Sequence, residues 1–248
     1  MPVGPPLVGD ADQGRQGHEQ EQADHGHHRG QCFTLRRIHG HHCPARHPLP
    51  GVAVLPHTLD LLPTARQTGA MLRNVAAVLL DGVNPFELGV VCEVFGVDRS
   101  DDGLPVYDFA VASADGPAVR TINGFSLQVA HGLERLETAD LIAVPAGAAY
   151  TSREFPPGML DALRRGVDRG ARVLSVCSGV FVLAAAGLLD GRRAAAHWKH
   201  AEELTRQYPH LTVEPDVLYV DEDPVITSAG TAAGIDACLH LVRKEQGP

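Results

Sequence analysis

Ser175-Val176-Cys177-Ser178-Gly179 is the stretch of this sequence that decides the fold. An apolar run over 171–174 precedes it and an alanine-rich run over 180–186 follows, which predicts a strand, a tight turn and a helix. This order is typical of a nucleophile elbow, in which a Ser or Cys occupies a strained strand-to-helix turn. A thiol there lies at the helix N-terminus, so we expect a lowered pKa for Cys177. The alternative is a buried cysteine that only fills the core.

Apolar runs and helical segments alternate along the chain from residue 71 onward. We expect a hairpin centred on Asn123-Gly124 and a helix that begins at Asn84-Pro85, with Phe86, Val90 and Val94 on its apolar face. Strands are predicted near 75–80, 106–111, 141–144, 172–176, 217–220 and 225–227, and helices over 159–167, 198–208 and 231–244. This alternation predicts a flavodoxin-like three-layer α/β sandwich with a mainly parallel sheet.

Residues 1–70 differ in character from the predicted domain, which spans 71–248. They hold nine of the fourteen histidines and no sustained apolar period before Val52, so we expect a low-order, disordered extension. The histidines and Cys43 within 25–43 raise the possibility of a bound transition metal, but their spacing fits no zinc template closely. We therefore expect neither a metal nor a cofactor.

Composition and charge limit the classes of function. Residues 1–70 carry 6 Lys/Arg and 6 Asp/Glu, whereas residues 71–248 carry 15 and 24. The predicted domain is therefore acidic, and we do not expect it to bind nucleic acid directly. The five cysteines have no framework spacing, and no apolar run approaches the roughly 20 residues that span a bilayer. These features favour a cytoplasmic protein without membrane contact.

Three candidate site segments follow three of the predicted strands, at 81–87, 145–148 and 177–179. Because the carboxyl ends of parallel strands meet at one edge of a sheet, we expect these segments to converge. Glu87 is the acid of this group. It either completes a capping box with Asn84 or binds the Cys177 sulfur through its carboxyl group.

Other candidates surround the predicted elbow. His197 precedes a helix, where it is either a solvated or capping residue or the general base for Cys177. The backbone N–H groups of Gly147 and Ser178 are candidate donors to an oxyanion. Two further residues, Gly230 and Thr231, either line the mouth of the pocket or cap the last helix, and we favour capping.

Three blocks of the sequence resemble the ThiJ/PfpI superfamily, whose folds are of the class I glutamine amidotransferase type. They are the run over 176–194 followed by His197-Trp198, the segment over 81–95, and the segment over 226–236. The resemblance covers roughly 71–245. It is strongest to the amidase-like N-terminal domain of AraC-type transcriptional regulators.

This resemblance implies a domain that senses a small molecule and forms a homodimer, with Cys177, Glu87 and His197 as its reactive group. In those regulators a C-terminal helix-turn-helix module binds DNA. The chain ends at Gly247-Pro248, so we expect that module to be absent. The turn Pro145-Ala146-Gly147 is also less glycine-rich than the family pattern, which bears on the oxyanion site.

Two other functions are compatible with the same residues. An isonitrile hydratase or amidase-like hydrolase would use Cys177 as nucleophile and Glu87 as proton carrier. A redox sensor would need only oxidation of the thiol to a sulfenic or sulfinic acid.

Overall fold

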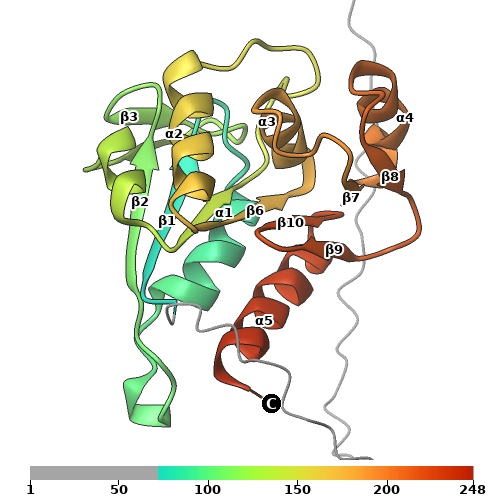
Figure 1. Cartoon of the computed structure of the whole chain (residues 1–248). Helices are drawn as coiled ribbons and strands as arrows, with labels where there is room; N and C mark the ends of the chain where they lie inside the picture. Colours follow the sequence, from blue (N-terminus) through green and yellow to red (C-terminus); the bar gives the residue numbers. More distant parts are fainter. Residues whose placement is uncertain (1–71, 248) are drawn as a thin grey trace, which may run out of the picture. The chain divides into compact units, whose positions relative to one another are not determined.

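The computed structural model describes residues 72–247, which form a central sheet between two layers of helices (Figure 1). The sheet has six strands in the order β2 (Asp108–Ser113), β1 (Asn74–Leu79), β5 (Leu141–Val144), β6 (Arg172–Val176), β10 (Val225–Ser228) and β9 (Tyr219–Glu222). All neighbouring strands are parallel except β9, which pairs antiparallel with β10 at one edge. The predicted flavodoxin-like sandwich with a mainly parallel sheet is confirmed.

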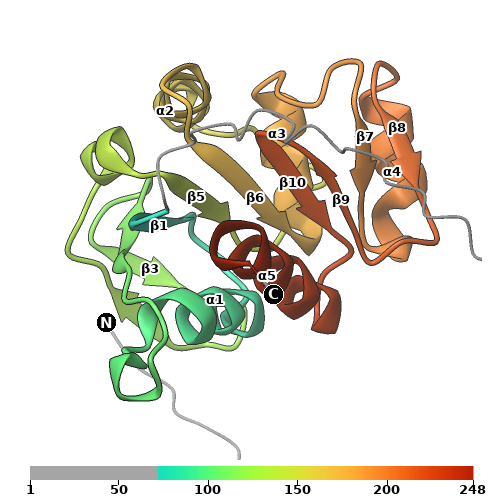
Figure 2. The ribbon, with the colours of Figure 1, turned by 60° about the horizontal axis from the view of Figure 1, so that its bottom comes forward.

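Helices cover both faces of the sheet. Apolar side chains of α1 (Pro85–Val91) and α5 (Ala232–Gln246) pack in one core cluster, and those of α2 (Pro157–Asp168) and α3 (Val180–Ala185) pack in the other. Figure 2 shows the two pairs on opposite sides of the sheet. The predicted extension 1–70 lies outside the described residues.

The apolar run of β1 supplies both clusters because successive side chains of a strand point to opposite faces. Ala76 and Val78 belong to the cluster under α2 and α3, whereas Val75, Ala77 and Leu79 belong to the cluster under α1 and α5. A strand that is buried on both faces therefore reads as a continuous apolar run, which is how it was predicted.

The start of α1 follows the sequence prediction, but its apolar face does not. The Asn84 side chain caps the helix by accepting a hydrogen bond from the Phe86 N–H at 3.2 Å. The prediction that Phe86 lies on the buried face is wrong, since 52% of it is exposed. After α1, a π-helical turn over Cys92–Gly96 changes the helical register and places Phe95 in the core at 1% exposure.

Two small sheets lie beside the central one. The predicted hairpin around Asn123-Gly124 is confirmed as the antiparallel pair β3 (Ala118–Arg120) and β4 (Ser126–Gln128). The parallel pair β7 (Arg193–Ala195) and β8 (Thr212–Glu214) was not predicted as a pair. Helix α4 (Trp198–Gln207) connects its two strands, so this part of the chain is a small βαβ unit near β9.

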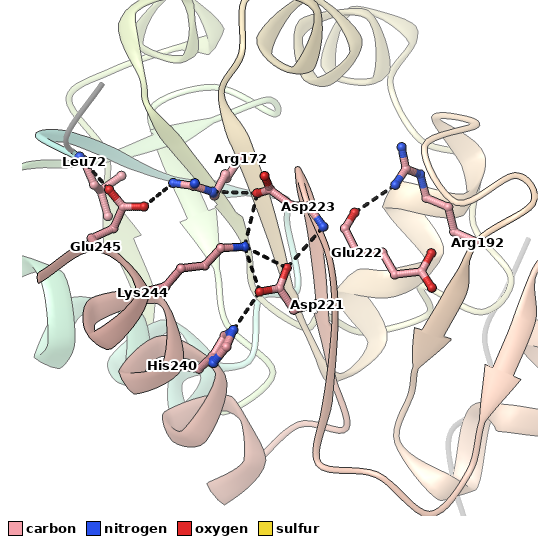
Figure 3. Close-up of polar contacts among 9 residues, drawn as sticks. All are labelled: Leu72, Arg172, Arg192, Asp221, Glu222, Asp223, His240, Lys244 and Glu245. Atoms are coloured by element: carbon pink, nitrogen blue, oxygen red, sulfur yellow. Dashed lines mark hydrogen bonds and ion pairs between the residues drawn. The ribbon is translucent and has the colours of Figure 1, made fainter. Parts of the chain in front are cut away.

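A network of charged side chains joins the last turns of α5 to the β9–β10 turn and to the start of β6 (Figure 3). Asp221 accepts hydrogen bonds from His240 Nε2 at 2.7 Å and from Lys244 Nζ at 2.9 Å. Arg172 donates to Asp223 at 2.7 Å and pairs with Glu245. Burial alone would raise the pKa of Asp221, but the bonds from His240 and Lys244 outweigh it and lower the pKa.

Replacing Asp221 with Asn is expected to lower the free energy of unfolding at neutral pH by about 1–2 kcal/mol, because two charge-assisted hydrogen bonds weaken. A carboxyl group whose folded pKa is lowered stabilises the fold above its unfolded pKa, and this contribution disappears as pH falls through the folded pKa. The difference between the variant and the wild type should therefore shrink below about pH 4.

Urea unfolding of Asp221→Asn at several pH values measures this effect. Asp236→Asn is the control, since Asp236 lies exposed on α5, the helix that carries His240 and Lys244. Equal stability of Asp221→Asn and wild type at neutral pH would contradict the role given to the network.

Candidate functional site

The predicted site segments converge at the carboxyl edge of the sheet. Val83 and Gly147, which follow β1 and β5, form an isolated antiparallel bridge. The Gly147 N–H donates to Ser178 Oγ, in the turn after β6, at 3.3 Å. Gly230, in the turn after β10, lies directly against Cys177. Four connections between strands and helices therefore meet around the thiol.

Cys177 occupies the predicted strand-to-helix elbow. Strand β6 ends at Val176, one 3₁₀ turn spans Cys177–Gly179, and α3 begins at Val180. The backbone of Cys177 has φ +56°, a left-handed conformation that costs a non-glycine residue about 1–2 kcal/mol. A side chain at Gly179 would place its Cβ 2.1 Å from the Val144 carbonyl oxygen, so the turn packs closely against β5.

Gly230 packs directly against Cys177. A Cβ built on this residue would lie 2.3 Å from the Cβ of Cys177 and 2.8 Å from its Sγ. With its φ of +87°, Gly230 also adopts a backbone conformation that other residues rarely take. Only glycine fits between the β10 turn and the elbow.

Thr231 is the N-cap residue of α5, but its hydroxyl makes no cap hydrogen bond. Instead, Oγ1 donates to the carbonyl oxygen of Gly230 at 2.8 Å, and the backbone has φ +48°. Thr231 therefore occupies the cap position of the last helix, as favoured, but its side chain makes no capping hydrogen bond. Its backbone N–H instead faces Glu87, where it helps to lower the pKa of the carboxyl group.

Glu87 is buried, with 2% of the residue exposed, and its Oε2 has no hydrogen-bond partner within residues 72–247. Burial raises the pKa of this carboxyl group, while the N–H groups of Glu87 and Thr231 and the charge of His197 oppose the rise. The capping-box interpretation is not supported, because the Asn84 N–H donates to the Ala146 carbonyl oxygen at 2.8 Å. A buried carboxyl oxygen without a partner requires an explanation, and a bound ligand supplies one.

The expected thiolate character of Cys177 is wrong for this structure. Burial raises the pKa of the Cys177 thiol to about 11, the negative charge of Glu87 adds to the rise, and the Ser178 N–H opposes it. The helix that follows has six residues and begins after a 3₁₀ turn, so its dipole is small beside the loss of hydration. The site therefore holds a protonated thiol at neutral pH.

His197 caps the helix that it precedes. Its Nδ1 accepts a hydrogen bond from the Lys199 N–H at 3.2 Å, and its ring centroid lies 5.4 Å from that of Trp198. Within the described part of the chain His197 forms no hydrogen bond with Cys177, although its charge acts on Glu87. The geometry supports the capping role, and the role of general base stays a prediction.

The candidate oxyanion donors are partly engaged. The Gly147 N–H donates to Ser178 Oγ, and the Ser178 hydroxyl lies at the same 3.3 Å from the Gly147 carbonyl oxygen. The Ser178 N–H faces the sulfur of Cys177. To bind these two N–H groups, an oxyanion would therefore have to displace Ser178 Oγ from the Gly147 N–H and the Cys177 sulfur from the Ser178 N–H.

Tyr150 is a site neighbour that sequence reasoning did not identify. A Cβ on Gly147 would lie 2.3 Å from the Tyr150 ring, which is why the turn after β5 needs glycine there. The Tyr150 hydroxyl is buried and has no hydrogen-bond partner among the described residues. Nothing in the local sequence signals this contact, because Tyr150 reaches the turn through loop packing.

Two further observations limit what the described region can be. No group of three metal-ligating side chains occurs among residues 72–247, and the histidine cluster of 25–43 lies outside them. In the same region, no helix combines the length and the apolar character needed to cross a bilayer.

Together, the fold and the site define a three-layer α/β domain with a cysteine at its strand-to-helix elbow and a buried acid beside it. Residues 73–244 match the DJ-1/PfpI family. The chain belongs to this family.

Relatives include both regulators and an enzyme. The HTH-type transcriptional regulator CdhR of Pseudomonas aeruginosa is 39% identical over 143 residues, which cover 58% of this chain and 42% of CdhR. The isonitrile hydratase of Pseudomonas putida is 33% identical over 144 residues, which cover 58% of this chain and 62% of the enzyme. The chain thus spans less than two thirds of either relative.

Solved structures carry the same fold. The crystal structure of an AraC family transcriptional regulator from Pseudomonas putida aligns with a TM-score of 0.61 and 21% identity, over 71% of this chain and 93% of that one. At this identity the likeness establishes the fold alone.

Alkylation of Cys177 by iodoacetamide should be slow at neutral pH and should accelerate up to about pH 11, because the thiol is protonated below its raised pKa. Glu87→Gln is expected to lower the pKa of Cys177. At the alkaline pH where the thiol ionises, Glu87 is a carboxylate, and removing its negative charge favours the thiolate.

Mass spectrometry of the Cys177 peptide measures these rates separately from the other cysteines. Glu93→Gln makes the same chemical change at an exposed position and serves as the control. An apparent pKa below the value of about 8.5 for a free cysteine would show that the thiol is activated after all.

Proposed function

We propose that this domain senses a small molecule for transcriptional regulation of the AraC type and that it acts as a homodimer in the cytoplasm. One observation carries the proposal: the half-buried Cys177 thiol, whose pKa burial raises, lies beside the buried Glu87 carboxyl group, whose Oε2 has no hydrogen-bond partner within residues 72–247. Such a pair offers a hydrogen-bond donor and acceptor to a ligand rather than an ionised nucleophile. The similarity to CdhR, an HTH-type transcriptional regulator, supports this function.

DNA contact would come from a helix-turn-helix unit attached to this domain or associated with it. The acidic balance of residues 71–248, with 24 Asp/Glu against 15 Lys/Arg, supports a domain that does not bind the phosphate backbone itself. Ligand binding beside Cys177 would then alter the arrangement of the dimer.

A second candidate is a cysteine enzyme that hydrates isonitriles, which the similarity to isonitrile hydratase favours. Cys177 Sγ would attack the isocyano carbon while its proton passes through Glu87 to that carbon, giving a thioimidate. Water would then add to the same carbon, and loss of the thiol would leave an N-substituted formamide. The raised pKa of Cys177 opposes the first step unless the thiol proton is transferred at the same time as the sulfur attacks the substrate.

Thermal unfolding of the protein in the presence of each compound of a metabolite panel tests the sensor proposal. A ligand should raise the melting temperature by mass action, and Cys177→Ala or Glu87→Gln should raise its Kd on the order of tenfold or more. Cys92→Ala, a second half-buried cysteine outside the site, should leave the Kd unchanged.

Turnover separates the two candidates. The sensor predicts that the bound compound is not consumed by the wild type. Conversion of an isonitrile to its formamide by the wild type, abolished by Cys177→Ala, would establish the enzyme and overturn the sensor.

A further inference from the structure

An open pocket of about 530 Å³ lies at the same edge of the sheet as the elbow, but its lining contains none of Cys177, Glu87 and His197. The segments after β1, β3 and β5 form it. Its volume falls within the range of sites that bind small molecules. No residue of this pocket has a role in the function proposed above.

Backbone hydrogen bonds build the frame of the pocket. The Gly82 N–H donates to the Arg120 carbonyl oxygen at 2.8 Å, and the Ala148 N–H donates to the Gly82 carbonyl oxygen at 2.8 Å. Gly82 has φ +85°, and a Cβ on it would lie 3.1 Å from the Ala148 Cβ. The three segments are therefore fixed together, and the absence of a side chain at Gly82 keeps the space between them open.

Arg153 lines this pocket, and its guanidinium group is fixed by a hydrogen bond and by an aromatic ring while some of its N–H groups remain without an acceptor in the described region. Its Nη1 donates to the Asp81 carbonyl oxygen at 3.1 Å, and its side chain is 25% exposed. Its Cζ lies 6.0 Å from the centroid of the Tyr150 ring, which supports the group from one side. The guanidinium also forms an ion pair with Asp115 Oδ2 at 3.5 Å but makes no second hydrogen bond within residues 72–247, so several of its N–H groups can donate to a ligand.

Arg153 has fewer engaged side-chain donors than Arg120, the other arginine of this pocket. Arg120 is already paired with Asp81 through Nε at 2.8 Å and through Nη2, and these bonds lower the pKa of Asp81. Asp115 Oδ2, the ion-pair partner of Arg153 at 3.5 Å, also accepts a shorter hydrogen bond from the Asp81 N–H at 2.8 Å. An incoming anion therefore finds its best partner at Arg153.

Apolar side chains form the rest of the wall. Ile122 lines the pocket and is 49% exposed, although it is large and apolar. Ala148 and Ala149 also line the pocket. A ligand that covers Ile122 would remove this apolar surface from water. The pocket thus pairs one cationic anchor with a short apolar surface.

We propose that this pocket binds a small carboxylate that carries a short apolar chain. The carboxylate receives hydrogen bonds from Arg153, whose planar fork matches it, and the chain lies against Ile122, Ala148 and Ala149. The site is separate from the thiol, so carboxylate binding there does not depend on whether Cys177 recognises a second compound.

NMR titration of the chain with butyrate tests the proposal, and butyramide, its uncharged isostere, is the control compound. Butyrate should bind and butyramide should not. Arg153→Gln should raise the Kd of butyrate on the order of tenfold, because a charge-assisted pair is lost. Arg99→Gln, which removes another arginine that is paired with a carboxylate, should leave the Kd unchanged.

A second variant keeps the test valid if Arg153→Gln unfolds. Ile122→Ala should weaken butyrate several-fold while leaving acetate unchanged, because only the longer acid reaches the apolar wall. Cys177→Ala should bind butyrate like the wild type, which separates this result from the fate of the sensor proposal. Absence of butyrate binding, equal binding of butyramide, or binding insensitive to both pocket variants would overturn the proposal.

Discussion

The contact between Gly230 and Cys177 is the constraint on which the rest of the site depends. No side chain fits at Gly230, because its Cβ would lie 2.3 Å from that of Cys177. The contact exists because β6 and β10 are parallel neighbours that end together, with Val176 opposite Ser228. Helix α5 begins immediately afterwards and turns the Thr231 N–H toward Glu87. The turn after β10 therefore packs against the half-buried thiol and also presents a backbone N–H to the buried carboxyl group.

The local sequence contains much of the fold but little of what depends on distant contacts. The buried run Leu141–Val144 and the cap at Asn84 were predictable, because strand burial and helix capping are properties of neighbouring residues. The pair of β7 and β8 was not, since Arg193–Ala195 is short and its partner lies beyond a whole helix. The π-helical turn over Cys92–Gly96 was also missed, and with it the burial of Phe95.

The site shows the same division. Strand order alone brings the segments of Cys177 and Glu87 to one edge of the sheet, and Gly230 was a candidate for the mouth of the pocket or for the cap of the last helix. The direction of the Cys177 pKa shift could not be predicted, because it depends on how deeply Gly230 and the neighbouring loops bury the sulfur. Arg153 carried no sequence signal, since only the packing of the loop after β5 places it beside Gly82. Strand order thus predicted that Cys177 and Glu87 lie at one edge of the sheet, whereas the position of Cys177 at a helix N-terminus gave the wrong direction for its pKa shift.

The central claim is that the pair of Cys177 and Glu87 recognises a compound without reacting with it. Native mass spectrometry of the chain with a compound that raises its melting temperature tests this directly, with denaturing mass spectrometry of the same sample. If the pair only recognises the compound, the complex dissociates on denaturation and leaves the compound unchanged and Cys177 as a free thiol. A covalent adduct on Cys177, or release of a chemically altered compound, would contradict this claim.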